Sequence, residues 1–148
     1  MIKSATINDI SVLVEMAVML WDSHDKLELS KEFEETIKSK NNIFFIKYIN
    51  NNPVGFAHCS LRHDYVEGTS SSPVGYLEGI YIKDDYRGSG YAKELLDACI
   101  DFSKQNGCSE FASDCELDNN NSLLFHKALG FEEVNRVICF KKNIWIKK

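Results

Sequence analysis

The stretch RGSGYA, residues 87–92, decides the fold because it joins an apolar run to a helical one. The apolar run covers residues 75–82, and the helical pattern continues from residue 91 to residue 106. A glycine-rich turn at the start of a helix exposes backbone N–H groups and the positive end of the helix dipole, which suit a phosphate or pyrophosphate. Two glycines also make an ordinary strand-to-helix turn, so the turn alone leaves both interpretations open.

The glycine spacing separates this turn from two other phosphate-binding motifs. A dinucleotide-binding turn needs G-x-G-x-x-G, and a Walker A loop needs Gly-Lys-Ser/Thr; neither pattern is present here. The stretch resembles instead the R/Q-x-x-G-x-G/A signature of the GCN5-related N-acetyltransferases, whose turn holds the pyrophosphate of acetyl-coenzyme A. The resemblance implies that the cofactor contacts Arg87, Gly88, Ser89, Gly90, Tyr91 and Ala92.

Composition and charge narrow the class of protein. The 148 residues suffice for one domain, residues 1–148, and the hydrophobic (44%) and charged (26%) fractions are typical of a soluble globular protein. A net charge of −5 with no basic stripe argues against nucleic acid and favours a cationic substrate. No apolar run approaches the roughly 20 residues of a membrane span, so we expect no membrane partner.

The termini and cysteines indicate the compartment. The N-terminus, MIKSAT, lacks the apolar core and cleavage site of a signal peptide. The five cysteines form no C-x-x-C pair, and their number is odd. We therefore expect reduced, mostly buried thiols and a cytoplasmic protein.

Hydrophobic periodicity and turn residues predict an order of elements. Thr6 or Asn8 caps a first helix that ends near Trp21, and Ser30 caps a second helix that ends at Ser39. The order is a mixed α/β domain, and the resemblance implies a mostly antiparallel central sheet flanked by helices, the GCN5-related acetyltransferase fold. The later predicted elements are strands 42–49, 54–62 and 74–82, helix 91–106, strand 110–115, helix 123–129 and strand 134–141.

Glu78 is the first candidate for chemistry, because it lies inside an apolar run between Leu77 and Gly79. A buried carboxylate is costly unless it faces a cleft or a partner. It is either a surface residue at a sheet edge or a base that faces the substrate. An amine is mostly protonated near neutral pH, and a carboxylate takes its proton directly or through water. Gly79 predicts a β-bulge, which would free backbone groups for a ligand.

Asp114 is the second candidate, at the end of the predicted strand 110–115. Ligands bind where strands end in α/β sheets. An Asp that merely ends a strand in a turn is also common. We therefore predict Glu78 and Asp114 as the catalytic pair, and the spacing does not say which of them is the base.

Residues after the first helix and in the loop after the hairpin form a third group. Trp21 and His24 have Asp22 and Asp25 beside them, and Tyr65 has Glu67 two residues on. Aromatic faces with nearby carboxylates suit a polycationic, sugar-like ligand, which predicts Trp21, His24 and Tyr65 as substrate-binding residues. A tryptophan that closes the core, with solvated acids in the loops, explains the same residues.

The resemblance extends to a subfamily, the chromosomal-type aminoglycoside 6'-N-acetyltransferases. It implies transfer of acetyl from acetyl-coenzyme A to the 6'-amino group of an aminoglycoside, hence antibiotic resistance. It also implies that Glu78, Asp114, Trp21 and Tyr65 line the acceptor pocket, and that the protein is a homodimer with C-terminal strands at its interface. The segments that carry it include RHDYVEG (62–68), SSPV (71–74), YLEGIY (76–81), FASD (111–114) and LGFEE (129–133).

The family pattern also implies cofactor contacts near the C-terminus. Asn119 and Ser122 fit an N-x-x-A-like pattern ahead of a Gly-Phe pair, so Asn119 would hydrogen-bond the pantetheine arm. Alternatively, Asn119 caps a helix. His126 stands where many family members have a Tyr that protonates the departing thiolate, and we predict that it contacts the cofactor.

These observations combine into a hypothesis of direct transfer in a ternary complex without a metal. The pantetheine arm would pair with the central strand, and a backbone N–H there would polarise the thioester carbonyl. One carboxylate would accept the amine proton through water while the other positions the cation. Two alternatives stay open: an acetyltransferase for a polyamine or peptide N-terminus, and a non-catalytic sensor of acyl-coenzyme A. The strand residues predicted to hold the cofactor are Ile80, Tyr81 and Ile82.

Overall fold

The structure is a computed structural model that describes residues 1–145. It divides into two compact units, Met1–Asp114 and a second that begins at Cys115. The strands of the first unit are β1 (Ile2–Ser4), β2 (Asn42–Ile49), β3 (Asn52–Arg62), β4 (Val74–Ile82) and β5 (Phe111–Ser113). Its helices are α1 (Ile10–Leu20), α2 (Lys26–Lys38) and α3 (Tyr91–Gln105), with single 3-10 turns η1 (Ile7–Asp9) and η2 (Asp84–Tyr86).

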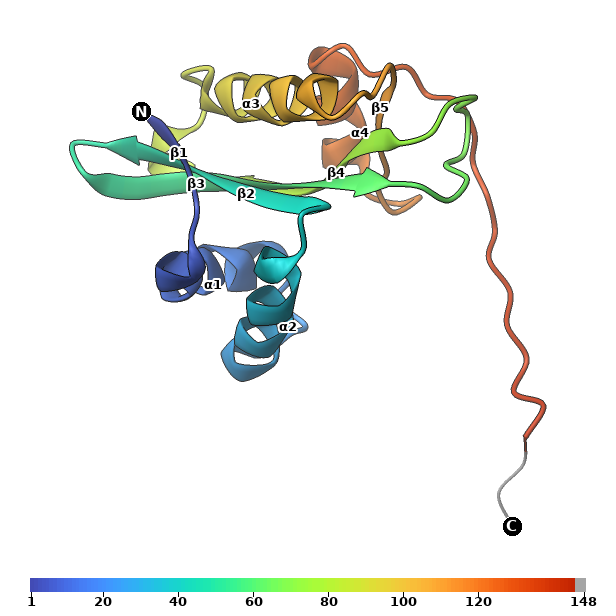
Figure 1. Ribbon diagram of the computed structural model, residues 1–148, viewed down its shortest axis with the longest axis horizontal. Coiled ribbons are helices and arrows are strands. Elements are labelled where there is room, and N and C mark those ends of the chain that lie inside the picture. Colours follow the sequence, from blue (N-terminus) through green and yellow to red (C-terminus); the bar gives the residue numbers. More distant parts are fainter. Residues whose placement is uncertain (146–148) are drawn as a thin grey trace. The chain divides into compact units, whose positions relative to one another are not determined.

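The sheet has the order β1-β2-β3-β4-β5. The first three pairings are antiparallel, and only β4 and β5 are parallel, across the connection that contains α3. Helices α1 and α2 cover one face of the sheet and α3 covers the other (Figure 1). The predicted mixed, mostly antiparallel sheet flanked by helices is therefore confirmed.

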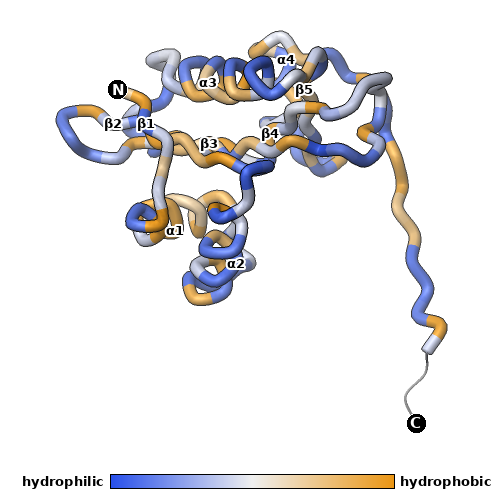
Figure 2. Tube along the Cα trace, in the orientation of Figure 1, coloured by the Kyte–Doolittle hydropathy of each residue, from blue (hydrophilic) through white to orange (hydrophobic). Residues whose placement is uncertain are grey.

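Amphipathic helices produce the core on the α1/α2 face. Figure 2 shows apolar residues recurring along the turns of the helices and along β3. These positions meet on one side of the sheet, as helical and strand periodicities require. The buried residues of this cluster are Ile10, Leu13, Val14, Met16, Ala17, Leu29, Phe33, Phe44, Ile46 and Phe56.

The α3 face has its own contacts with the sheet. Leu95, Leu96 and Cys99 are buried, and the thiol of Cys59 on β3 lies 3.7 Å from the backbone oxygen of Cys99. All five cysteines are free. Cys115 and Cys139 are exposed, so the expectation of mostly buried thiols holds only for some of the cysteines.

Several boundaries differ from the predicted ones for local reasons. Helix α2 begins after Asp25, whose carboxylate accepts a hydrogen bond from the backbone N–H of Glu28 at 2.7 Å. The prediction that Ser30 caps this helix was wrong, because Asp25 satisfies the free N–H groups one turn earlier. Strand β1 was not predicted, since three residues carry too little periodicity to be recognised.

The second unit contains one helix, α4 (Asn120–Ala128), which begins three residues before the predicted start. The predicted strand 134–141 is not found, and residues 131–145 form neither helix nor strand. A strand needs a neighbour to pair its N–H and C=O groups, and within the described part of this unit there is no other strand. None of the helices among residues 1–145 has the length and apolar character needed to cross a membrane.

Candidate active site

A β-bulge in the middle of β4 builds the centre of the site. In the pairing with β3, Leu77 lies opposite Cys59 and Gly79 lies opposite His58, so Glu78 is an additional residue without a partner. The bulge predicted beside Gly79 is therefore present. A Cβ atom at Gly79 would lie 2.5 Å from Cζ2 of Trp21, so only glycine lets this ring pack against the strand.

The carboxylate of Glu78 accepts hydrogen bonds from two side chains of β3. Ser60 Oγ donates to Oε2 at 2.5 Å, while Arg62 donates from Nε to Oε2 at 3.0 Å and from Nη2 to Oε1 at 2.7 Å. Burial disfavours the charged carboxylate, but the hydrogen bonds and positive charge of Arg62, aided by Ser60, outweigh it and lower the pKa of Glu78. The carboxylate is therefore ionised at neutral pH and already partly neutralised by Arg62.

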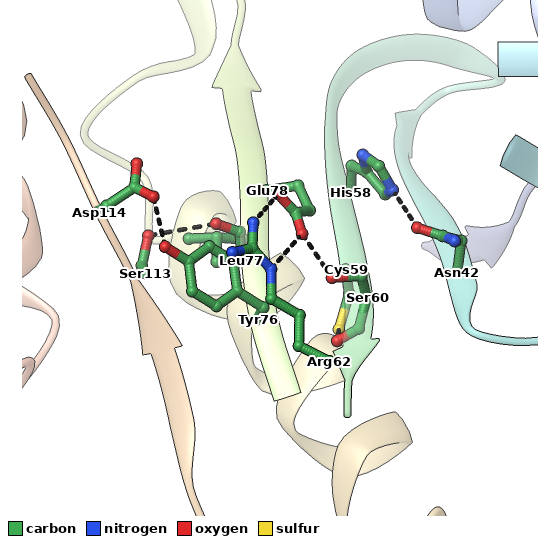
Figure 3. A network of polar contacts seen from close by, with 10 residues as sticks. All are labelled: Asn42, His58, Cys59, Ser60, Arg62, Tyr76, Leu77, Glu78, Ser113 and Asp114. Carbon is green, nitrogen blue, oxygen red and sulfur yellow. Dashed lines mark hydrogen bonds and ion pairs between the residues drawn. The ribbon is translucent and has the colours of Figure 1, made fainter. Parts of the chain in front are cut away.

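The same arginine connects Glu78 to Asp114. The guanidinium carbon of Arg62 lies 3.4 Å from the ring centroid of Tyr76, and the Tyr76 hydroxyl donates a hydrogen bond to Asp114. Burial, followed by the nearby Asp114 carboxylate, raises the pKa of Tyr76, so the phenol stays protonated and remains a donor. Figure 3 shows these polar contacts across β3, β4 and the end of β5, with Arg62 beside the Tyr76 ring. The structure thus brings the two predicted carboxylates into one network.

A pocket of about 220 Å³ opens beside the bulge. Of the predicted substrate residues, Trp21, His24 and Glu78 line it, whereas Tyr65 and Asp114 are not among its lining residues in the described part of the chain. Tyr65 is 76% exposed. Sequence reasoning missed the contribution of α2 and of β3. The lining residues are Trp21, His24, Leu29, Glu32, Phe33, His58 and Glu78.

Trp21 packs in the core and also lines the pocket, while its binding of a substrate stays a prediction. Its ring packs edge-on against Phe33 and Phe56, with centroids 6.5 and 6.2 Å away, and it also lines the pocket. An aromatic wall whose position is fixed by core contacts presents a rigid face to a ligand.

The cofactor side of the site begins where β5 ends. Strand β5 pairs only with residues 75–77 of β4, so from Glu78 onward the second edge of β4 has no paired strand among residues 1–145. The predicted cofactor residues Ile80, Tyr81 and Ile82 lie on this stretch, and their other edge pairs with β3. An unpaired strand edge offers N–H and C=O groups to an extended ligand.

The glycine-rich turn has the backbone that its sequence predicts. Gly88 and Gly90 have φ values of 81° and 83°, in the left-handed region where glycine is favoured, and Gly90 is the N-cap of α3. Gly90 itself has no side chain to cap the first N–H groups of this helix, and such N–H groups suit an anion. Arg87 Nε donates to the Ile82 backbone oxygen at 2.8 Å, which fixes the turn to the end of β4.

A buried lysine that the sequence analysis missed supports the same turn. Lys47 on β2 is 5% exposed, and its Nζ lies 2.9 Å from Glu94 Oε2 and 4.7 Å from the ring centroid of Tyr91. The hydrogen bond to Glu94 is the main reason that the pKa of Lys47 is raised. The first turn of α3 is thereby attached to the sheet by a charged pair and a cation–π contact.

In the second unit, the predicted cofactor residues have local partners. Asn119 Oδ1 accepts a hydrogen bond from the Ser122 N–H at 3.0 Å, so Asn119 caps α4, as its alternative interpretation proposed. The Nδ1 atom of His126 lies 2.7 Å from the Ser122 backbone oxygen, and the His126 ring packs edge-on against Phe125 and Phe131. Cofactor contacts of Asn119 and His126 remain predictions.

The polar face of β3 was the signal that could have revealed more of the site. His58, Ser60 and Arg62 alternate along an otherwise apolar strand, so all three side chains point to one face. A row of polar residues on the inner face of a strand indicates a ligand site or a buried network, and here Ser60 and Arg62 form the network with Glu78 while His58 lines the pocket.

Comparison with known proteins places these features in a family. The model of the acetyltransferase (GNAT) family matches residues 13–131. The chain is 41% identical over 127 residues to aminoglycoside N(6')-acetyltransferase type 1 of Acinetobacter genomosp. 13, covering 85% of this chain and 86% of that protein. It is 38% identical to the protein of the same name from Acinetobacter baumannii, covering 93% and 94%.

Solved structures agree with the sequence comparisons. The enzyme AAC(6')-Iy in complex with the bisubstrate analogue CoA-S-monomethyl-acetylneamine superposes with a TM-score of 0.91, at 36% identity and 97% coverage of both chains. The apo structure of the 6'-N-acetyltransferase AAC(6')-Ig from Acinetobacter haemolyticus superposes with a TM-score of 0.94, at 35% identity and 97% and 99% coverage.

Proposed function

This chain belongs to the acetyltransferase (GNAT) family, and on that premise we propose that it is an aminoglycoside 6'-N-acetyltransferase that confers antibiotic resistance. It transfers the acetyl group of acetyl-coenzyme A to the 6'-amino group of an aminoglycoside. One observation carries the proposal: a pocket containing the Glu78 carboxylate adjoins a strand edge that is open from this residue onward. Acceptor and cofactor sites thus meet at one bulge.

The cofactor fits the residues on the other side of the bulge. The uncapped N-terminus of α3, with Gly88 and Gly90 in left-handed conformations, suits the pyrophosphate. The pantetheine arm pairs with the free edge of β4 at residues 80–82, and a backbone N–H on this edge polarises the thioester carbonyl. Asn119 and His126 complete the cofactor contacts in this proposal.

Transfer proceeds directly between the two bound substrates. The ammonium group first loses one proton, and the resulting amine nitrogen forms a bond to the thioester carbon. The C–S bond then breaks, the nitrogen gives up its second proton, and the coenzyme A thiolate takes up a proton through water and leaves as the thiol. Either Glu78 or Asp114 takes the amine proton through water, while the other carboxylate holds the cation. Trp21 and His24 form the aromatic wall of the acceptor pocket, and Tyr65 contacts the acceptor from its loop.

Acceptor regiospecificity tests the proposed reaction. We expect rapid acetylation of an aminoglycoside that carries a 6'-amino group, and much slower N-acetylation of its counterpart with a 6'-hydroxyl group. The site holds the 6'-amino group beside the thioester, and in the 6'-hydroxyl compound no other amino group would reach that position. Thiol release with acetyl-coenzyme A and each compound measures the rates. Equal turnover of both compounds would rule out 6'-specific transfer, and cofactor binding without any acceptor-dependent thiol release would indicate a sensor.

The wider organisation is part of the same proposal. The family match spans residues 13–131 and so includes parts of both compact units, which supports one acetyltransferase domain. Free cysteines are typical of a reducing compartment, which supports the cytoplasm. A homodimer is supported by the apolar side chains near the C-terminus, of which Phe140, Ile144 and Trp145 are 89–90% exposed.

A double substitution tests the homodimer. In Phe140→Glu/Trp145→Glu, two charges replace the apolar side chains that a partner would cover, so we expect the dimer to dissociate. Light scattering coupled to gel filtration measures the mass of each species. Leu27→Glu is the matched control, because Leu27 is exposed but lies on α2 in the first unit. A monomeric wild-type protein, or a double variant that remains dimeric, would contradict the proposal.

A further inference from the structure

His58 is the pocket residue whose role is not explained by the network around Glu78. It lies on β3 opposite Gly79, next to the bulge, and it lines the pocket together with Glu78. Figure 3 shows the imidazole between the Glu78 side chain and Asn42, on the neighbouring strands. It is therefore close to the carboxylate that binds the acceptor in the proposed function.

Two contacts fix the orientation of this ring. One ring nitrogen, Nε2, lies 2.8 Å from Asn42 Oδ1, and the ring stacks on Phe44 with a centroid distance of 4.2 Å and an interplanar angle of 16°. Because an amide oxygen only accepts hydrogen bonds, Nε2 carries the proton in this arrangement. The other nitrogen, Nδ1, then has a free lone pair and is an acceptor.

The Nδ1 atom is accessible. Among residues 1–145, every buried side-chain nitrogen or oxygen that is shielded from solvent has a hydrogen-bond partner. No protein group in this part of the chain bonds to His58 Nδ1, so the atom must reach the surface. Since His58 lines the pocket, the lone pair is available to a bound molecule.

The charged groups around His58 leave the ring neutral. Burial is the main cause that lowers its pKa to about 4, with Glu78 on β4 raising it and Arg62 on β3 lowering it. His24, after α1, and Glu32, on α2, face the same pocket. A neutral imidazole can accept a hydrogen bond from an ammonium group without repelling it, whereas an imidazolium cannot.

We propose that Nδ1 of His58 accepts a hydrogen bond from an ammonium group of the acceptor, and that Asn42 keeps the imidazole in the tautomer that permits this. The inference rests on the proposed function, and it makes His58 a determinant of acceptor affinity. Glu78 supplies negative charge to the acceptor, but its oxygens already accept three hydrogen bonds from Ser60 and Arg62. His58 supplies an acceptor atom that no protein donor occupies.

The first test removes the acceptor atom. We expect His58→Leu to raise KM for the aminoglycoside about tenfold, the effect of losing a hydrogen bond to a charged donor, with KM for acetyl-coenzyme A unchanged. His58→Gln keeps a side-chain oxygen and should recover much of the affinity. Steady-state kinetics with both substrates provides the comparison. Unchanged acceptor KM in a folded His58→Leu variant would overturn the proposal.

The second test gives the ring of His58 a positive charge without removing the ring. In Asn42→Asp the new carboxylate stabilises the imidazolium, so the pKa of His58 should rise toward neutrality. The acceptor KM should then be about tenfold higher at pH 6 than at pH 8, beyond any change in wild type. NMR titration of His58 gives its pKa in each protein, and the pH effect should vanish in Asn42→Asp/His58→Gln.

The outcomes are distinguishable. A raised pKa of His58 with no pH-dependent change in acceptor KM would contradict the inference. If the pKa of His58 does not rise in Asn42→Asp, the acceptor KM values of His58→Leu and His58→Gln decide whether the inference holds. If the wild-type protein acetylates no aminoglycoside at all, the proposed function fails. If the wild-type protein is active and the His58 variants have the same acceptor KM, only the inference about His58 fails.

Discussion

Replacement of Glu78 by Gln should lower kcat/KM for the aminoglycoside by about 10²- to 10³-fold, mostly through kcat, if this carboxylate accepts the amine proton. The amide removes the negative charge and turns an N–H group toward Arg62, so the guanidinium loses its partner. Because the pKa of Glu78 is lowered, the acidic limb of the wild-type profile should lie below the range of an ordinary glutamate, and the variant should lack this limb. The measurement is kcat against pH with one aminoglycoside.

Asp114→Asn is the matched comparison for Glu78→Gln. Asp114 accepts a hydrogen bond from the Tyr76 hydroxyl at the other end of the network. Loss of its charge should chiefly raise the acceptor KM, by a factor equivalent to about 1–3 kcal/mol of binding free energy. A normal pH profile for Glu78→Gln together with a collapsed kcat for Asp114→Asn would reverse the two roles. Thermal unfolding of both variants separates these effects from a loss of folded protein.

Replacement of Gly90 by Glu should raise KM for acetyl-coenzyme A at least about tenfold and change the acceptor KM much less. The residue caps α3 with φ of 83°, so a side chain strains the turn and a carboxylate repels the pyrophosphate from the N–H groups that bind it. Initial rates with each substrate varied in turn give both constants.

Two controls isolate the cause of that effect. Gly90→Gln adds similar bulk and strain without charge, so the difference between the two variants measures electrostatic repulsion. Gly107→Glu introduces the same charge at φ of 85°, but beyond the C-terminal end of α3. An acetyl-coenzyme A KM that is unchanged in folded Gly90→Glu would contradict the placement of the pyrophosphate.

The sequence predicted the parts of the fold whose signals are local. Strand β4 is a largely apolar run and helix α3 has apolar residues at helical spacing, and the glycines between them adopt a turn conformation that other residues rarely adopt. The bulge was predictable because a carboxylate followed by glycine interrupts an apolar strand. Trp21, His24 and Glu78, which the sequence predicted to bind the substrate, line one pocket, and their binding role stays a prediction.

The missed features depend on contacts between distant segments. Nothing local marks Glu32 of α2 as a neighbour of Glu78, since the packing of that helix on the sheet brings them together. The pairing of Arg62 with Glu78 depends on the register of β3 and β4, including the extra residue. The predicted strand 134–141 contains a run of apolar, strand-favouring residues at 137–140, but pairing requires a neighbour that the described part of its own unit does not provide.

The arginine that pairs with Glu78 has a consequence for how each catalytic cycle ends. In the proposed reaction, acetylation converts a charged amine into a neutral amide, so the product would no longer neutralise the carboxylate of Glu78. Leaving a partly buried carboxylate without a counter-ion would be costly, and this cost would retain the product. With the Arg62 guanidinium 2.7 Å away, the carboxylate keeps a resident counter-ion when the acetylated antibiotic departs. In the proposed mechanism, the arginine would thus favour product release and leave the site ready for the next antibiotic molecule.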